Sequence, residues 1–222
     1  MGSDWPVSGH AIPLSIGSGI TKLTASLSQG EATAMVIKAA RGFGLSWGLA
    51  EEAGWALCQL GQFGDDPLSW FDRAFNESTE NCPIMIGTTV MDHAPLAGSL
   101  AQKGGDMGHI RMPILLIPFL RKSAQRVGHR LFLCEIISGL RVDVSDDLGK
   151  HIEQLSSIFA GHVVIEVGAQ LNSFQPLRPK SYRFQTSKDI LARLDKLGSR
   201  TYVPETEASR MSGAGAGTSD ND

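Results

Sequence analysis

Between residues 28 and 76, hydrophobic positions recur at the three- and four-residue spacing of amphipathic helices. Ser28 and Glu31 form a capping box, in which the hydroxyl and the carboxylate each accept an amide hydrogen bond, and a helix opening there ends at Gly42 or Gly44. Ser46 opens a second helix that runs to about residue 60 and has Trp47 available for burial, together with Ala50, Ala53, Trp55 and Leu57. A cap followed by a first-turn proline opens a third helix over residues 66–75. The pattern therefore predicts a helical hairpin followed by a third helix.

Beyond Pro83 the hydrophobic positions form the short runs and alternations that are typical of strands. The clearest case is Leu140, Val142 and Val144, which alternate with polar residues as in a sheet with one wet face. The strands are expected over residues 84–90, 114–120, 130–137, 140–144, 162–167 and 182–185, with helices over 146–160 and 187–197 and a glycine-rich loop over 94–109.

Helices followed by a run of strands indicate the α+β class. We expect an N-terminal helical hairpin plus third helix, followed by a mixed or antiparallel sheet with one or two covering helices; the strand order stays open. The expected organisation is an irregular lead-in over residues 1–24 with a short edge strand near 12–16, a single α+β domain over 25–200, and a tail over 201–222. Within the domain, the helical part covers about 28–76 and the sheet part about 83–197.

The composition narrows the class of protein. With 42% hydrophobic and 19% charged residues, the chain of 222 residues is typical of a packed globule. A net charge of −3 gives no electrostatic reason to expect a nucleic-acid partner. The strongest apolar run, residues 112–120, is far shorter than the ~20 residues of a spanning helix, so we expect no membrane partner. Residues 1–6 lack the start of an export signal, and three widely spaced cysteines fit a reducing compartment, so a cytoplasmic location is expected.

The sequence contains only weak candidates for catalytic or metal-binding residues. No two of the six histidines have the short spacing of a common zinc site, and we expect neither a metal nor a cofactor. His162 and Glu166 share one face of a strand, but two ligands are too few for a metal site. His93 follows the strand expected over residues 84–90, a favourable place for a general acid or base, and a surface histidine beside a turn is the alternative interpretation.

The C-terminal segment holds the strongest candidate binding residues. Arg200 and Arg210 can each direct a planar guanidinium to a carboxylate or phosphate, and Tyr202 offers a phenol nearby. Glu207 lies about one turn from Arg210 in an expected short helix and is a second candidate for proton transfer. The glycine run that follows lets backbone amides approach a ligand, although glycine-rich acidic tails are also typical of terminal disorder.

Two segments resemble a known family. One is the stretch Lys38-Ala-Ala-Arg-Gly-Phe-Gly-Leu-Ser-Trp-Gly-Leu-Ala-Glu-Glu-Ala-Gly54, and the other is the ending from Arg200-Thr-Tyr-Val-Pro204 through the Gly-Ala-Gly-Ala-Gly run to Asp222. Together they are similar to an uncharacterised proteobacterial family, domain of unknown function 3726. The resemblance implies no activity and no catalytic residues. Glu205-Thr206 departs from the small residue and serine expected there, and Thr206 keeps the hydroxyl.

Two hypotheses of function follow, and the sequence does not decide whether the protein is an enzyme. In the first, a cytoplasmic protein binds a small anionic metabolite, and the hypothesis leaves open whether the protein also transforms that metabolite. Arg200, Tyr202 and Arg210 hold the ligand in this case, Trp47 and Glu51 line the same pocket, and Glu207 or His93 moves a proton. In the second, the chain is a non-catalytic accessory or interaction subunit of a metabolic complex, in which an exposed tryptophan contacts a protein partner.

Overall fold

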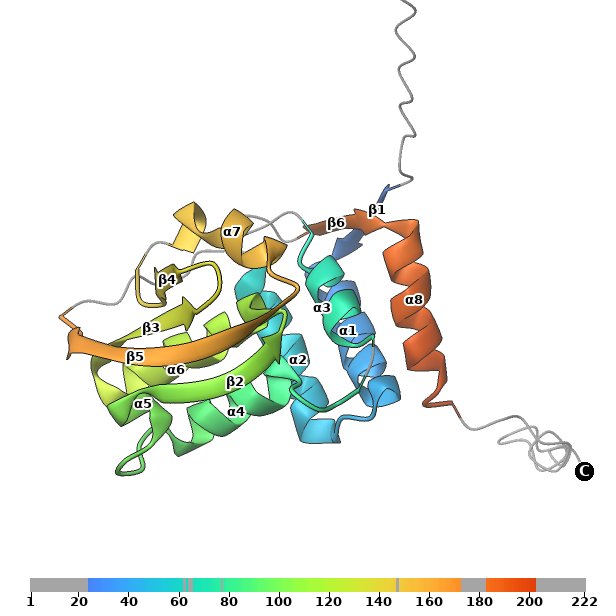
Figure 1. Cartoon of the computed structure of the whole chain (residues 1–222). Helices are drawn as coiled ribbons and strands as arrows, with labels where there is room; N and C mark the ends of the chain where they lie inside the picture. Colours follow the sequence, from blue (N-terminus) through green and yellow to red (C-terminus); the bar gives the residue numbers. More distant parts are fainter. Residues whose placement is uncertain are drawn as a thin grey trace, which may run out of the picture.

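The protein has an α+β fold, as expected, with two antiparallel sheets and a helical layer (Figure 1). The computed structural model describes residues 24–61, 63, 66–76, 78–146, 148–172 and 183–202. The strands are β1 (Thr24–Ser28), β2 (Gly105–Arg111), β3 (His129–Glu135), β4 (Leu140–Asp143), β5 (Ala160–Gln170) and β6 (Arg183–Ser187). The helices are α1 (Gln29–Phe43), α2 (Trp47–Leu60), α3 (Leu68–Ala74), α4 (Pro83–His93), α5 (Leu100–Lys103), α6 (Ile117–Val127), α7 (Ile152–Ser157) and α8 (Lys188–Ser199), with 3-10 helices η1 (Pro113–Leu116) and η2 (Leu148–Lys150).

The larger sheet has the order β2-β5-β3-β4, and every neighbouring pair is antiparallel. Its inner face supplies Leu131, Leu133 and Ile165 to the core, while its outer face carries the ion pairs Arg141–Glu166 and His162–Asp106, each at 2.8 Å. The alternation expected over residues 140–144 is therefore confirmed: β4 buries Val142 and turns Arg141 outward.

The smaller sheet joins the two ends of the described chain. β1 pairs with β6, and each strand runs directly into a helix, β1 into α1 and β6 into α8. Ser28 and Ser187 are the N-caps of those helices, as expected, and the Ser28–Glu31 capping box is complete. Two amide hydrogen bonds to Glu31 and Ser28, at 2.7 and 3.3 Å, close this box. The backbone hydrogen bond from Ser28 lowers the pKa of the Glu31 carboxyl.

α1 and α8 pack side by side at the right of Figure 1, and the contact depends on glycine. An ideal Cβ on Gly42 would lie 1.7 Å from the Leu197 carbonyl oxygen, so the α8 backbone occupies the space that a side chain would need. On the other helix, a Cβ on Gly198 would lie 3.2 Å from the Lys38 Cβ. The two helices therefore approach more closely than larger residues at these positions would permit.

The strand expected over residues 84–90 is wrong, because these residues belong to α4. Its β-branched residues favour a strand locally. Pro83 in the first turn favours a helix instead, and burial of Ile84, Gly87 and Val90 follows the helical period. Gly87 lies against the Phe119 ring, so packing against α6 decides the conformation.

The strand expected over residues 114–120 is also wrong, although the burial predicted for that run is confirmed. The run forms η1 and the start of α6, with Pro113 and Pro118 in their first turns. Every residue from Met112 to Arg121 is buried, and a segment buried all round carries no period that distinguishes helix from strand.

The single glycine-rich loop expected over residues 94–109 is wrong, because this stretch holds α5 and most of β2. The larger sheet therefore begins at Gly105 and not near residue 83. The helices expected over 28–44, 46–60, 66–75 and 187–197 and the strands expected over 130–137, 140–144 and 162–167 are confirmed within a few residues. Over residues 146–160 the helical part is shorter, η2 and α7. The edge strand expected near residues 12–16 lies outside the described residues.

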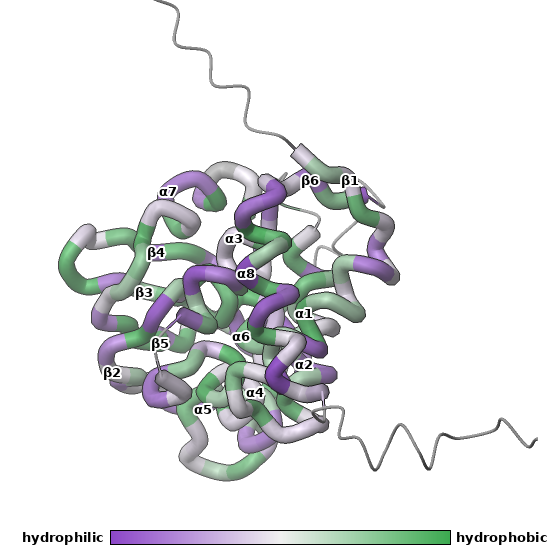
Figure 2. Tube along the Cα trace, turned by 90° about the vertical axis from the view of Figure 1, so that its right-hand side faces the viewer, coloured by the Kyte–Doolittle hydropathy of each residue, from purple (hydrophilic) through white to green (hydrophobic). Residues whose placement is uncertain are grey.

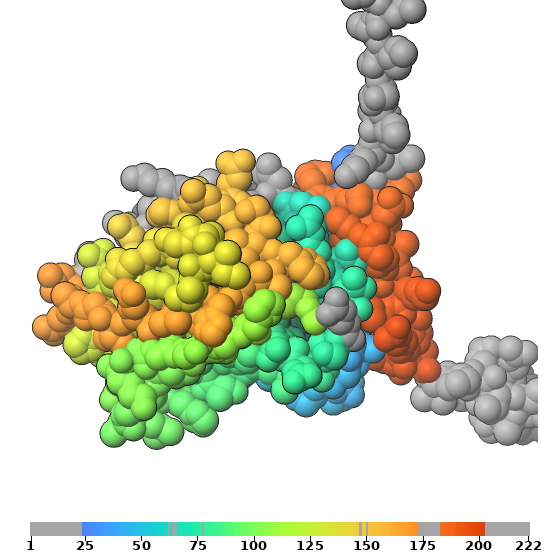
Figure 3. Space-filling view, in the orientation of Figure 1, coloured from blue at the N-terminus to red at the C-terminus, as the bar shows by residue number. Residues whose placement is uncertain are grey.

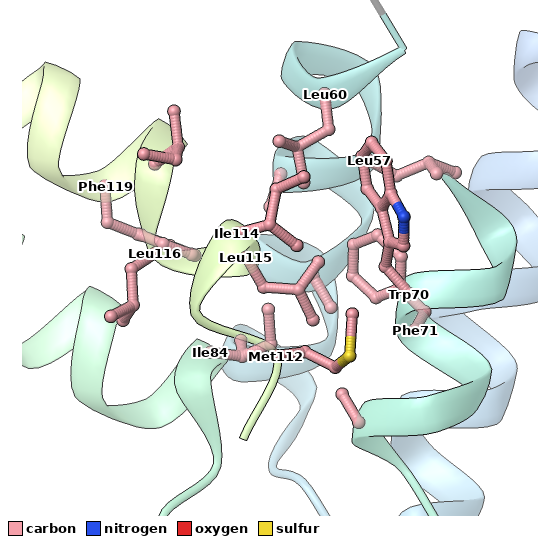
Figure 4. Close-up of a cluster of buried hydrophobic side chains, with 14 of the residues drawn as sticks. Leu57, Leu60, Trp70, Phe71, Ile84, Met112, Ile114, Leu115, Leu116 and Phe119 are labelled. Carbon is pink, nitrogen blue, oxygen red and sulfur yellow. The ribbon is translucent and has the colours of Figure 1, made fainter. Parts of the chain in front are cut away.

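The core lies between the sheet and the helices. In Figure 4, side chains from α2, α3, α4 and the η1–α6 segment point toward one another. The labelled members, all buried, are Leu57, Leu60, Trp70, Phe71, Ile84, Met112, Ile114, Leu115, Leu116 and Phe119.

Two charged side chains are buried beside this core. The Arg121 guanidinium, 3% exposed, donates to the Val144 and Asp146 carbonyl oxygens, and burial lowers its pKa to about 10. Glu135 accepts from the Ile137 and Ser138 amides in the turn after β3. Burial raises the pKa of its carboxyl, but the hydrogen bonds that it accepts, from Ser138 above all, together outweigh burial and lower the pKa. Arg121 thus fixes the segment that follows β4, and Glu135 fixes the turn that follows β3.

Candidate functional site: a cationic cleft between α1, α3 and α8

A cleft of about 300 Å³ opens where α8 passes the ends of α1 and α3. Figure 3 shows α8, in red, as an outer ridge of the molecule beside α3, in teal. The residues that line the cleft are Phe43, Asp72, Phe75, Asn76, Arg193, Lys196, Leu197 and Arg200. The volume falls at the lower end of the range for small-molecule sites.

The cations of the cleft come from one stripe of α8. Arg193 and Lys196 lie three residues apart and Arg200 follows four residues later, a spacing that places all three on one side of the helix. The apolar residue Leu194 belongs to the hydrophobic core, and Leu197, which is partly buried, packs against that core. In Figure 2, where the α8 side faces the viewer, hydrophilic and hydrophobic stretches alternate along this helix. The amphipathic pattern that docks α8 thus also presents its positive side chains at the cleft.

Arg193 is held in place by Asp72 of α3. Its Nε donates to both carboxylate oxygens at 3.0 Å, and its Nη2 donates to Oδ2 at 2.7 Å. The Asp72 side chain is 12% exposed and the Arg193 side chain 55%. The hydrogen bond to Asp72 raises the pKa of the Arg193 guanidinium. This bidentate pair fixes the geometry of the guanidinium and ties α8 to α3.

Lys196 and Arg200 are exposed, and their side chains have no hydrogen-bond or ion-pair partner within the described part of the chain. Two aromatic rings lie beside them: Phe43 and Phe75 stack with their centroids 5.1 Å apart. Phe75 is buried, whereas Phe43 is partly exposed. The cleft therefore combines an accessible phenyl ring with two cations that have no partner in the described part of the chain, an arrangement that suits an anion with an apolar part.

Of the residues predicted from the sequence for a ligand site, Arg200 lies in this cleft. The exposed side chains of Tyr202 and Trp47 are not among the residues that line it, and neither are Glu51 and His93. His93 belongs to the last turn of α4, not to the end of a strand. Arg210 and Glu207 lie outside the described residues. The expectation that Trp47 and Glu51 line one pocket with Arg200 is therefore not met by this cleft.

The burial anticipated for Trp47 is wrong, because its side chain is 66% exposed. The residue is the first of α2, and the Arg41 guanidinium lies 4.7 Å from the centroid of its ring. Arg41 also donates to the Leu45 carbonyl oxygen, so it links the α1–α2 connection to the indole. The ring is thus held at the surface by a cation from α1.

Sequence reasoning missed Arg193, Lys196 and Asp72. The two cations could have been found, because they share a stripe with Arg200 on a helix that the Ser187 cap already predicted. The role of Asp72 could not be predicted from the sequence, because Asp72 lies 121 positions from Arg193 and contacts it only through the packing of α3 on α8.

The outer face of the larger sheet places a second set of polar groups together. His162 and Glu166 share this face, as expected, and bind Asp106 and Arg141 respectively. The His162 Nε2 lies 2.8 Å from Asp106 Oδ1, and the Arg141 Cζ lies 3.5 Å from the Phe132 ring centroid. Among the residues that the structure describes, no three His, Cys, Asp or Glu side chains are grouped as for a metal ion. The cleft is therefore the better candidate site.

The fold and the site together define an α+β protein with a cationic cleft in its helical layer. Residues 27–97 match the family described as "Protein of unknown function (DUF3726)", which confirms the resemblance predicted from residues 38–54. The match contains Phe43, Asp72, Phe75 and Asn76 of the cleft, whereas the α8 residues lie outside it. No curated protein and no solved structure matches the chain. In the described part of the chain, no helix is both long and apolar enough to span a membrane.

Proposed function

We propose that this protein binds a small organic anion in the cleft between α1, α3 and α8. The observation that carries the proposal is that Lys196 and Arg200 lie together beside the partly exposed ring of Phe43. Neither cation has a hydrogen-bond or ion-pair partner among the described residues. Arg200 thereby keeps the ligand-binding role expected from the sequence, and Lys196 is proposed as a second ligand-binding residue. Arg193 is held by Asp72, which neutralises its charge, so Arg193 shapes the rim of the cleft without adding to its net charge.

The cytoplasmic location and the proteobacterial origin remain part of this proposal. The three cysteines are free, and two of them, Cys82 and Cys134, are buried, as suits a reducing compartment. Transformation of the ligand would need a group that moves a proton. Glu207 remains a prediction for that role, and the proposal made from the cleft concerns binding alone.

The substitutions Arg200→Gln and Lys196→Gln are each expected to weaken binding of a small anion about tenfold. Each removes from the cleft one charged side chain that would donate hydrogen bonds to the ligand. Benzoate, phenyl phosphate and inorganic phosphate are suitable probes, measured by isothermal titration calorimetry. Both side chains are exposed, so the melting temperature is expected to change little.

Lys188→Gln is the matched control. Lys188 is an exposed lysine in the first turn of the same helix and does not line the cleft, and its substitution removes the same charge. We expect wild-type affinity for this variant. Equal losses in all three variants would show a general effect of net charge, and the absence of binding by every probe would refute the proposal.

A second candidate function, an accessory or interaction subunit, is favoured by one observation. Trp47 exposes 66% of its side chain, and Arg41 over the ring restricts the orientation of the indole. Exposed tryptophan and arginine are the residue types most enriched among energetic hot spots of interfaces. Trp47 and Arg41 would then be the centre of a contact surface at the start of α2.

The substitution Trp47→Ala is expected to abolish recovery of a stoichiometric partner in affinity purification from the native host, because truncation of a central hot-spot residue costs ~2 kcal/mol or more. Tyr202→Ala is the control, since Tyr202 is also an exposed aromatic residue, at 63%. Recovery of the same partner with both variants would place the contact elsewhere, and purification of the wild type without a partner would refute this candidate.

A further inference from the structure

The charge in the cleft indicates which class of anion it accepts. Among the described residues, its charged side chains are three cations and one carboxylate, so two positive charges there remain unbalanced after Asp72 neutralises Arg193. The unbalanced pair is Lys196 and Arg200. An anion with two negative charges would neutralise the cleft, whereas a monoanion would leave one cation uncompensated.

The positions of the two cations decide how those negative charges are distributed. Lys196 and Arg200 are four residues apart at the C-terminal end of α8, a spacing that brings Cβ atoms to about 6 Å on a helix. Two long side chains from neighbouring positions of one stripe can converge on a single group. A group with both charges on one centre, and with several oxygens for the lysine and for the planar arginine, fits this arrangement better than two separated carboxylates.

The remaining lining describes the rest of the ligand. The partly exposed ring of Phe43 stacks on the buried ring of Phe75 and offers an apolar surface beside the cations. One doubly charged group balances the two remaining positive charges, so a ligand with one such group and an apolar body fits, whereas a chain of several phosphates carries more negative charge than the cleft balances.

We infer that the ligand is a phosphate monoester whose phosphate is held between Lys196 and Arg200 and whose apolar, preferably flat, body lies against Phe43. This inference rests on the proposed function, because it names the ligand class of the same cleft. No bond is made or broken in it, so it concerns recognition only.

The test compares three probes by isothermal titration calorimetry with the full chain. Phenyl phosphate carries the dianion and the ring, inorganic phosphate the dianion without the ring, and benzoate the ring with one charge. At pH 7.5 we expect phenyl phosphate to bind at least tenfold more tightly than either of the others. Between pH 7.5 and pH 5.0, its affinity is expected to fall about tenfold, because the second phosphate pKa lies near 6.

The affinity of benzoate is expected to stay nearly constant over this pH range, because its carboxylate remains ionised. Phenyl phosphate should lose affinity in Lys196→Gln and Arg200→Gln and keep it in Lys188→Gln. The first two variants should also lose most of the pH dependence, since each leaves a single unpaired cation.

Each outcome has a distinct meaning. If benzoate binds as tightly as phenyl phosphate and both depend on Arg200, the cleft binds organic anions and the phosphate inference is overturned. Equal binding of inorganic phosphate and phenyl phosphate would overturn the role of Phe43. If no probe binds in a manner that depends on Lys196 and Arg200, the inference and the proposed function both fail.

Discussion

Replacing Gly42 with alanine is expected to lower the free energy of unfolding by about 3 kcal/mol, the upper part of the range for overpacking. The added Cβ would lie 1.7 Å from the Leu197 carbonyl oxygen and 2.5 Å from its carbonyl carbon. These are backbone atoms, which cannot move aside by a change of rotamer. α8 would have to shift away from α1, and chemical denaturation measures the loss.

The matched control is Gly48→Ala in α2. Gly48 is also a helical glycine, but no atom lies within 4 Å of the position of an added Cβ. Alanine is there expected to stabilise the helix by up to ~1 kcal/mol, because it restricts the unfolded chain and favours the helix. The close packing of α1 on α8 would be contradicted if both variants shifted the stability in the same direction.

Removal of the Phe119 ring is the second change with a large expected effect. Phe119 is fully buried, and its ring packs at 5.4 Å, edge to face, on Trp55. Truncation to alanine leaves a cavity between α2, α4 and α6, and a loss of about 3 to 5 kcal/mol is expected from thermal or chemical unfolding.

Gly87 provides an internal test of this packing. An added Cβ at Gly87 would lie 2.4 Å from the Phe119 Cδ2, so Gly87→Ala alone should also destabilise the protein, by about 1 to 3 kcal/mol. In a Phe119→Ala background most of that cost should disappear, because alanine lacks the Cγ and Cδ2 atoms that clash. A double-mutant cycle measures the coupling, and strictly additive losses would refute the contact.

The helices with explicit end signals could be predicted from the sequence. Ser28, Ser46 and Ser187 each cap a helix through a hydrogen bond that depends only on neighbouring residues. Gly44 ends α1 in the left-handed conformation, at φ 112°, that favours glycine. Local chemistry determines these boundaries, so no knowledge of the fold is needed to place them.

The segments predicted wrongly depend on their surroundings. In residues 84–90 the intrinsic preference of β-branched side chains favours a strand, and the close contact of Gly87 with the Phe119 ring favours a helix. In residues 114–120 complete burial removes the alternation of apolar and polar positions from which a period is read. Tertiary packing decides both segments, and packing is not visible in a local window.

The cleft was only partly predictable for the same reason. The positive stripe of Arg193, Lys196 and Arg200 is a property of one helix and can be read from the sequence. The contribution of Asp72 and Phe43 requires α1 and α3 to pack against that helix, which only the fold establishes. The exposure of Trp47 is likewise invisible in the sequence, because a first-turn tryptophan fits a buried position equally well.

The pairing of β1 with β6 has a consequence for the order in which the protein is made. Arg183 of β6 donates to Ser26 of β1, a residue 157 positions earlier in the chain. At the usual pace of translation, β1 and α1 leave the ribosome about 8 to 30 s before β6 and α8. Until then the face of α1 that α8 covers lacks its partner and stays exposed on the newborn chain. The emergence of α8, and not the appearance of the first helices, therefore sets the earliest moment at which the cleft can form.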